Sequence, residues 1–258
     1  MSTERLTCPA AGGRTLAARL EVPSGTVRAW AVFAHCFTCG KDGLAAVRVS
    51  RALARRGVGV LRFDFAGIGG ADGGFDGDDF SNDVADLVCA ARWLEAQGRP
   101  VELLVGHSLG GAAALLAAAE MPDLRALATI ASPADAAHVL EHFGDALPEI
   151  ERTGRADVTL SGRRFTVTRE FLADLQRHEE SRAASALTCG YLVMHAPGDE
   201  TVDIDNARLL FEAARHPKSF VSLDGADHLL SRKADADYAA GVICAWAERY
   251  LSPRPRAG

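Results

Sequence analysis

The sequence of 258 residues lacks the features that mark membrane and nucleic-acid-binding proteins. No stretch approaches the roughly 18 consecutive apolar residues of a membrane span, and the N-terminal residues have no apolar segment behind them. Long runs of lysine or arginine are absent and the net charge is -6, which argues against nucleic acid or an anionic membrane as a partner. We therefore expect a soluble, cytoplasmic protein, and the sequence leaves a homodimer open.

Motifs of common metal and cofactor sites are also missing. A second C-x-x-C and an H-E-x-x-H are both absent, so no metal site is predicted. The aspartates of residues 72–83 lack the spacing and closing glutamate of an EF-hand, which favours a solvated loop. The glycines of residues 67–77 match neither a dinucleotide fingerprint nor a phosphate loop, so no nucleotide cofactor is predicted.

Cysteine is scarce and scattered in this sequence. The six cysteines are Cys8, Cys36, Cys39, Cys89, Cys189 and Cys244. In a chain of this size, so few cysteines predict reduced, mostly buried thiols. Cys36 and Cys39 form a C-x-x-C motif, but redox motifs of this kind prefer a helix start in a thioredoxin-like context, so a redox role is not the expected one.

The sequence does contain a regular alternation of strand and helix patterns. Strands are predicted at residues 4–8, 14–22, 30–34, 58–65, 101–105, 125–131, 191–195 and 219–223, the first two as a hairpin at the sheet edge. Helices are predicted at residues 44–56, around 84–94, at 112–119 and at 234–251. This order predicts one α/β domain, with a mainly parallel sheet of about eight strands, helices on both faces, and functional groups at the carboxyl ends of the strands.

Residues 133–188 break that alternation and are predicted to form a cap inserted between core segments 1–132 and 189–258. The segment contains an apolar helical stretch over residues 139–150, a hairpin turning at Ser161 and Gly162, and a short helix over residues 169–177. Phe143 belongs to the apolar stripe, which we expect to cover an acyl pocket. The alternative is that the stripe packs only on the hairpin of the cap itself.

The centre of the sequence is the turn Gly106-His107-Ser108-Leu109-Gly110, between a predicted strand and an alanine-rich helix. G-x-S-x-G occurs by chance in roughly one chain in ten of this length, so an ordinary glycine-rich turn is the alternative. In a strand-turn-helix context, however, the pattern predicts a tight turn that exposes a nucleophilic Ser108 hydroxyl. The N–H of Leu109, at the helix start, becomes a donor to a developing oxyanion.

A serine nucleophile needs a histidine base and an acid, which should follow at other strand ends. His228 comes five residues after the last strand, at the correct edge, whereas His216 precedes that strand. Asp199 directly follows the strand that ends at His195, whereas Asp203 resembles a helix N-cap. The weaker candidates for the acid are Asp205, Asp224 and Asp227.

These residues resemble the α/β-hydrolase family. The similarity lies in the serine turn, in Asp199 followed by Val202, and in residues 225–228. Residues 33–42 and 64–69 more specifically resemble bacterial hydrolases that are often fused to an OsmC-type domain, which is not expected in this chain. The resemblance implies an α/β-hydrolase fold with the amide of Phe37 as second oxyanion donor, although Cys36 replaces the usual glycine before it.

We expect a serine hydrolase that cleaves short to medium carboxylic esters of small molecules through an acyl-enzyme, with Ser108, His228 and Asp199 as the triad. The sequence leaves thioesters open as an alternative class of substrate. Cofactor-free perhydrolase or haloperoxidase activity uses the same triad and is one alternative, and a non-catalytic binding protein is another. His35, Cys36, His107 and Phe143 are candidate substrate contacts, although histidines at strand ends more often shape loops.

Overall fold

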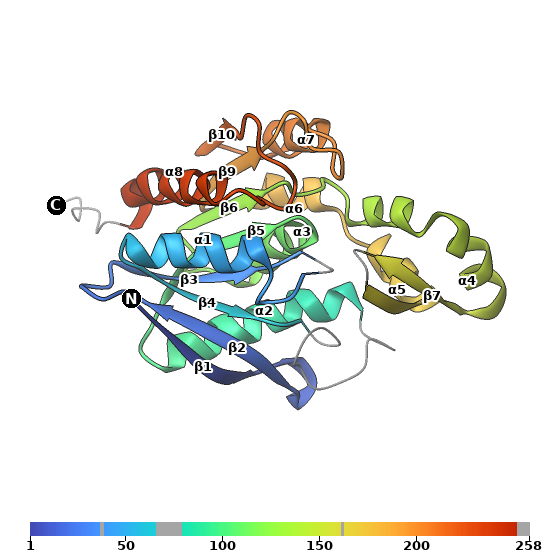
Figure 1. Ribbon diagram of the computed structural model, residues 1–258, viewed down its shortest axis with the longest axis horizontal. Helices are drawn as coiled ribbons and strands as arrows, with labels where there is room; N and C mark the ends of the chain where they lie inside the picture. Colours follow the sequence, from blue (N-terminus) through green and yellow to red (C-terminus); the bar gives the residue numbers. More distant parts are fainter. Residues whose placement is uncertain (37–38, 66–78, 161–162, 252–258) are drawn as a thin grey trace.

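An eight-stranded sheet forms the centre of the computed structural model, which describes residues 1–36, 39–65, 79–160 and 163–251 (Figure 1). The strand order is β1-β2-β4-β3-β5-β6-β9-β10. The bounds are β1 (Ser2–Pro9), β2 (Thr15–Val22), β3 (Ala29–Ala34), β4 (Val58–Phe63), β5 (Val101–His107), β6 (Ala126–Ile130), β9 (Gly190–His195) and β10 (Lys218–Ser222). The predicted α/β architecture is confirmed.

Six strands of this sheet run parallel, so their carboxyl ends meet at one edge. They are, in spatial order, β4, β3, β5, β6, β9 and β10. β1 and β2 pair antiparallel and β2 pairs antiparallel with β4, which confirms the predicted hairpin at the sheet edge. Open parallel sheets bind ligands at the carboxyl ends of their strands. A site is therefore expected among the loops that follow β3, β5, β9 and β10.

Helices cover both faces of the sheet. α1 (Leu44–Arg55) and α8 (Lys233–Leu251) pack on one face, whereas α2 (Phe80–Ala96), α3 (Leu109–Ala117) and α7 (Asp205–Ala213) pack on the other. Within β3, Ala31 and Phe33 belong to the apolar core under α1 and α8, whereas Val32 and Ala34 belong to the core under α2, α3 and α7. Successive side chains of a strand point to opposite faces, so a strand between two helical layers must be apolar throughout.

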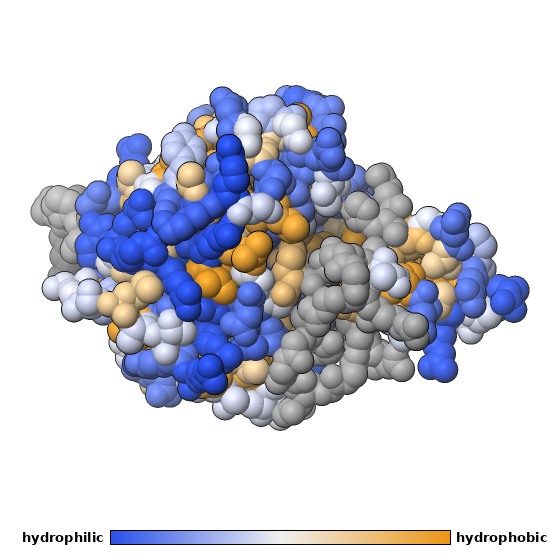
Figure 2. Space-filling view, in the orientation of Figure 1, coloured by the Kyte–Doolittle hydropathy of each residue, from blue (hydrophilic) through white to orange (hydrophobic). Residues whose placement is uncertain are grey.

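The outer surface of the core is polar where the helices meet solvent. Figure 2 shows hydrophilic residues over most of the face that α1 and α8 cover. α1 buries Val49 and Leu53 and exposes Arg51 and Arg55. Such a one-sided helix is stabilised mainly by the apolar stripe that it buries on the sheet.

The inserted segment after β6 holds η3 (Ala136–Ala146), α4 (Leu147–Thr153), β7 (Arg155–Leu160), β8 (Arg163–Thr168), α5 (Arg169–Leu175) and α6 (Glu180–Ala186). β7 and β8 form the predicted hairpin, whose turn at Ser161 and Gly162 lies outside the described residues. The prediction of one continuous helical stretch over residues 139–150 is wrong. The stretch is a 3-10 segment followed by α4, because Gly144 has a φ of 31°, outside the helical region, and Pro148 favours a new helix start.

Polar contacts attach this segment to the core. The carboxylate of Asp174, on α5, accepts hydrogen bonds from the N–H and hydroxyl of Ser81 at 2.7 and 2.8 Å. Ser81 is the second residue of α2, so α5 is joined to the start of a core helix. At the other end, Asn206 of the core helix α7 accepts a hydrogen bond from the N–H of Ala134 at 3.0 Å, while Glu180 of α6 accepts one from the N–H of Ala136 at 3.1 Å within the segment itself. That residues 133–188 act as a cap over the substrate stays a prediction.

Candidate active site

Ser108 occupies a strained turn between the end of β5 and the start of α3. Its φ is 56° and its ψ is -130°, a conformation that non-glycine residues rarely adopt and that is typical of a serine on such an elbow. The flanking glycines are required by close approach. A Cβ on Gly106 would lie 2.5 Å from the carbonyl oxygen of Gly110, and one on Gly110 would lie 2.6 Å from that of Ala34. The turn therefore holds the start of α3 tightly against the end of β3.

The hydroxyl of Ser108 belongs to a hydrogen-bonded chain of three side chains. Its Oγ lies 3.0 Å from Nε2 of His228, and Nδ1 of His228 lies 2.8 Å from Oδ2 of Asp199. An ionised carboxylate only accepts hydrogen bonds, so Nδ1 of His228 carries the proton and Nε2 presents a lone pair to the serine hydroxyl. The structure thus brings together the three residues predicted as a triad, from the ends of β5, β9 and β10.

Asp199 is held as a carboxylate by several donors. Its other oxygen, Oδ1, accepts hydrogen bonds from the N–H groups of Thr201 and Val202 at 2.9 and 3.0 Å. Burial opposes ionisation, but the hydrogen bonds from His228, Val202 and Thr201 outweigh it and lower the pKa of Asp199 below its ordinary value. Asp203 instead accepts a hydrogen bond from the N–H of Asp205 at 2.7 Å, next to the start of α7, although the N-cap residue of that helix is Ile204 and not Asp203 as predicted.

The loop that carries His228 is fixed from two sides. Asp227 turns away from the site and accepts a hydrogen bond from the N–H of Ser231 at 2.7 Å. From α1, the guanidinium of Arg48 donates hydrogen bonds to the carbonyl oxygens of Leu230, at 3.3 Å, and of Ser231. The position of the histidine therefore depends on a helix that begins about 180 residues earlier in the sequence, at Leu44.

Three buried histidines at strand ends donate hydrogen bonds to the loops of the site. Nδ1 of His35 lies 2.7 Å from the carbonyl oxygen of Cys36, Nε2 of His107 lies 2.7 Å from that of His228, and Nε2 of His195 lies 2.8 Å from that of Val202. Carbonyl oxygens only accept, so each of these nitrogens carries a proton. Burial lowers the pKa of His195, and burial with the neighbouring His228 ring lowers that of His107 to about 3. Contact between His35 or His107 and a substrate stays a prediction.

Two backbone donors are proposed for an oxyanion. Leu109 is the first residue of α3, where N–H groups have no partner inside the helix, and its role as a donor to an oxyanion stays a prediction. Phe37, the other predicted donor, lies outside the described residues. That second donor follows from family resemblance alone and stays a prediction.

Cys36 and Cys39 form a disulfide beside that loop, with Cα atoms 5.5 Å apart. The expectation of reduced thiols is therefore wrong for this pair. The N–H of Cys39 donates to the carbonyl oxygen of Cys36 at 3.2 Å, and this turn brings the two Cα atoms within the range that a disulfide needs. Composition alone carries no information on such a turn. The four remaining cysteines are free, and Cys8, Cys189 and Cys244 are buried as expected.

A buried group of charges anchors the chain that follows the disulfide. Lys41 donates to Asp64 through its main-chain N–H at 2.7 Å and through Nζ at 2.6 Å. The guanidinium of Arg62 donates to the carbonyl oxygen of Lys41 at 2.7 Å and also pairs with the buried Glu21. These four residues are at most 6% exposed. Lys41 and Asp64 lie in the stretches that resemble the hydrolase family, but the sequence predicts no role for them.

Phe143 lies on η3 and is 3% exposed. It belongs to the apolar core that also contains Val158 and Phe165 of the cap hairpin. This burial favours the alternative in which the stripe packs within the cap. A contact between Phe143 and an acyl chain stays a prediction.

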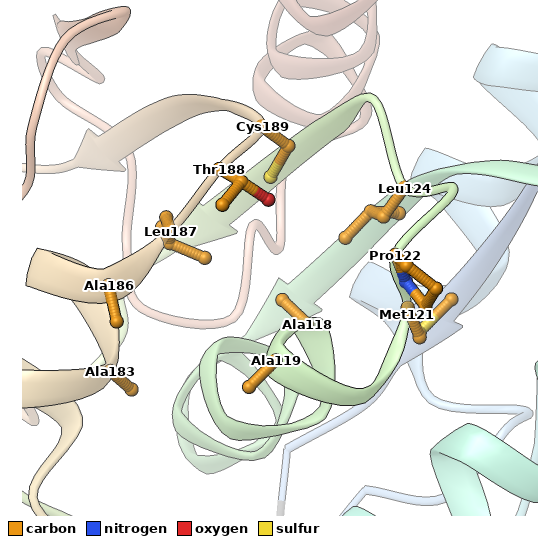
Figure 3. A pocket seen from close by; sticks show the side chains of 10 residues that line it. All are labelled: Ala118, Ala119, Met121, Pro122, Leu124, Ala183, Ala186, Leu187, Thr188 and Cys189. Carbon is orange, nitrogen blue, oxygen red and sulfur yellow. The ribbon is translucent and has the colours of Figure 1, made fainter.

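An apolar pocket of about 280 Å³ lies at the amino ends of β6 and β9, opposite the strand ends that carry the triad. Figure 3 shows its lining, which includes Ala118 and Met121 after α3, Leu124 just before β6, and Cys189 just before β9. Ser108 precedes α3, whereas this pocket adjoins the far end of that helix, roughly 13 Å away at 1.5 Å per residue. The pocket is therefore separate from the triad.

In the described part of the chain, no helix is both long and apolar enough to cross a membrane. Its side chains also form no group of three or more His, Cys, Asp or Glu residues that could hold a metal ion.

Comparison with known proteins agrees with this geometry. The sequence model described as "Alpha/beta hydrolase family" matches residues 31–242. The chain therefore belongs to the α/β-hydrolase family. Within it, the chain is 43% identical to the crystal structure of the esterase domain of a Rhodothermus marinus protein, with a TM-score of 0.79 over 98% of this chain and 100% of that one.

A second relative comes from mouse. The chain is 28% identical over 216 residues to mitochondrial palmitoyl-protein thioesterase ABHD10 of Mus musculus, which covers 79% of this chain and 70% of the mouse protein. The solved structure of mouse ABHD10 has a TM-score of 0.77 over 98% of this chain and 100% of that one, at 23% identity. At that identity the structural likeness speaks for the fold alone.

Proposed function

We propose that this protein is a serine hydrolase that cleaves carboxylic esters through an acyl-enzyme. The observation that carries the proposal is the chain from Ser108 Oγ to His228 Nε2 at 3.0 Å and from His228 Nδ1 to Asp199 Oδ2 at 2.8 Å. Family membership and a 43% identical esterase domain support hydrolase chemistry of this kind.

In the first half of the reaction, Ser108 Oγ attacks the ester carbonyl carbon while His228 Nε2 takes the hydroxyl proton. Asp199 keeps the other ring nitrogen protonated and stabilises the imidazolium that forms. The carbonyl oxygen becomes an oxyanion, which the N–H of Leu109 and, by resemblance, that of Phe37 stabilise. His228 then gives its proton to the alcohol oxygen as the C–O bond breaks, which leaves Ser108 acylated.

In the second half, water attacks the acyl-enzyme. His228 takes a proton from the water, a second tetrahedral oxyanion forms in the same place, and its collapse returns the proton to Ser108 Oγ. The carboxylic acid leaves and the enzyme is regenerated. The neutral form of His228 is required at the start of each half, and its tautomer is the one that Asp199 selects.

The proposed substrates are esters with short to medium acyl chains. Thioesters form the second candidate class, because the mouse relative is named a palmitoyl-protein thioesterase. The same triad would also serve cofactor-free perhydrolase or haloperoxidase chemistry. Substrate assays separate those activities from ester hydrolysis. A non-catalytic binding protein is the rival from another class, and the complete hydrogen-bonded triad argues against it.

The test is a series of activated esters and matching acyl thioesters, from acetyl to palmitoyl, assayed with wild type and Ser108→Ala. We expect turnover on short to medium esters that falls by roughly 10⁴ to 10⁶ in the variant. Wild-type turnover in Ser108→Ala would refute the assignment of the nucleophile. A strong preference for palmitoyl thioesters would move the proposal to the second class.

A further inference from the structure

We propose that His107 is a positioning residue whose Nε2–H holds the main chain of His228, so that the base stays within hydrogen-bonding distance of Ser108. The inference rests on the proposed function, because it assigns His107 a role in the same reaction. His107 itself touches neither the substrate carbonyl nor the transferred proton in this account. It acts through His228.

The contact joins the nucleophile and the base by a short path. Nε2 of His107 lies 2.7 Å from the carbonyl oxygen of His228, and the two rings are 5.2 Å apart between centroids. His107 is the last residue of β5, in the middle of the sheet, and one peptide bond links it to Ser108. One hydrogen bond therefore ties the strand that carries the nucleophile to the loop that carries the base.

The loop of His228 needs such a contact because it starts from the edge of the sheet. β10 pairs with β9 and ends the strand order, and its five residues are partly or fully exposed. Leu229, the residue after His228, is 41% exposed. Loops with few buried contacts move most easily, whereas His107 is 1% exposed and packed within the core. A donor from the buried centre of the fold thus adds a restraint next to His228 itself, beyond the contacts of Asp227 and Arg48.

The donor must also stay uncharged during the reaction. When His228 takes the serine proton it becomes an imidazolium, and a second positive charge 5.2 Å away would disfavour that state. Burial and the neighbouring His228 lower the pKa of His107 to about 3, so it remains a neutral donor. Lysine or arginine could donate the same hydrogen bond but would repel the imidazolium.

Two amide substitutions separate positioning from general packing. In His107→Gln, the side-chain amide reaches about as far as Nε2 and can still donate to the carbonyl oxygen of His228. In His107→Asn, the amide lies near the place of Nδ1 and falls short. Because a shift of about 1 Å in a reacting group can cost about 100-fold, we expect kcat to fall roughly 10- to 100-fold in His107→Asn. We expect kcat within about 5-fold of wild type in His107→Gln, and little change in KM in either variant.

Thr129→Val is the matched control. Thr129 is fully buried on the neighbouring strand β6, and its hydroxyl lies 2.9 Å from that of Tyr191, away from the triad. This substitution removes a buried hydrogen bond of similar kind and should leave kcat unchanged. Equal kcat in the Gln and Asn variants, or a change in KM with kcat preserved, would overturn the positioning role.

A measurement on the wild type keeps the proposal testable if a variant fails to fold. Nitrogen NMR of the His107 ring should show the neutral form with its proton on Nε2 throughout pH 5 to 8. A proton on Nδ1, or titration of this ring within that range, would contradict the proposal. The NMR result does not depend on turnover, so a wild type that hydrolyses no ester would refute the proposed function while this measurement still decides the hydrogen bond.

Discussion

Asp64 accepts hydrogen bonds from both the main-chain N–H and the ammonium of Lys41, at 2.7 and 2.6 Å. This double contact fixes the chain just after the Cys36–Cys39 disulfide to the end of β4. Both side chains are buried, so neither can turn to water if its partner is removed. The pair is therefore a structural support for the chain between β3 and α1.

Asp64→Asn should lower the free energy of unfolding by about 3 to 5 kcal/mol, because it removes the buried counter-charge of Lys41 and leaves only the exposed carboxylate of Asp42, at 3.4 Å. Urea unfolding measures the loss. The matched control is Asp237→Asn, which removes the partly exposed pairs with Arg55 and Lys233 and should cost less than about 1 kcal/mol. Equal losses in the two variants would show that the buried Lys41–Asp64 pair stabilises the fold no more than the partly exposed pairs do.

Asp199→Asn should reduce kcat by roughly 10⁴ because an amide no longer selects the tautomer of His228 that presents a lone pair to Ser108. Asp203→Asn changes a residue at the start of α7, and kcat should stay close to wild type. Steady-state kinetics on one activated ester compares the two. A modest loss in Asp199→Asn together with a large loss in Asp203→Asn would assign the acid to Asp203.

Stability should fall as the pH drops below about 6.5. The folded protein keeps His107 neutral, with a pKa of about 3 against an ordinary value of 6.5, and burial lowers the pKa of His195 as well. Between these values the unfolded chain binds more protons, so acid favours unfolding. The Asp199 carboxylate, whose folded pKa is also lowered, adds stability that is lost only at more acidic pH, below its ordinary value of 3.8.

The size of this effect follows from comparison with His107→Gln, which cannot titrate at that position. From pH 6.5 to 5, the wild type should lose about 2 kcal/mol more than the variant, at roughly 1.4 kcal/mol per pH unit for one group. Urea unfolding at several pH values gives the difference. A difference in stability between the two proteins that is independent of pH would show that His107 has the same pKa in the folded and unfolded states, and would contradict the account.

Phe143→Ala should lower the free energy of unfolding by about 3 to 5 kcal/mol, because the ring is 3% exposed and its loss leaves a cavity. The ester chain-length series on the folded variant then separates the two interpretations of the apolar stripe. An unchanged preference for chain length would show that Phe143 packs only within the cap. A flattened preference, with turnover on acetate esters intact, would show that it lines the acyl site.

Much of the fold followed from local patterns. The apolar run of β5, the glycines around Ser108 and the alanine-rich α3 each have local physical causes, so the sequence predicts that segment. The choice of His228 over His216 followed from the rule that sites form at the carboxyl ends of parallel strands, and the structure puts His216 before β10 and His228 after it.

The features that sequence reasoning missed depend on contacts between distant segments or on single backbone angles. The Cys36–Cys39 bond depends on a turn whose geometry the spacing leaves open. The buried contacts of Lys41 with Asp64 and Arg62 require the end of β4 to lie beside the loop after β3. Similarly, α6 was not predicted, α7 was indicated only by the capping pattern at Asp203, and the helical stretch around Phe143 is interrupted at Gly144 by one positive φ.

The central claim is that Ser108 is a nucleophile activated by His228, and labelling with a fluorophosphonate probe tests it most directly. Peptide mass spectrometry of the labelled, folded protein should find one phosphonyl group, on the peptide that contains Ser108. His228→Ala should label far more slowly, and Ser108→Ala should not label. A folded wild type that stays unlabelled, or a label on another residue that persists in Ser108→Ala, would contradict the account.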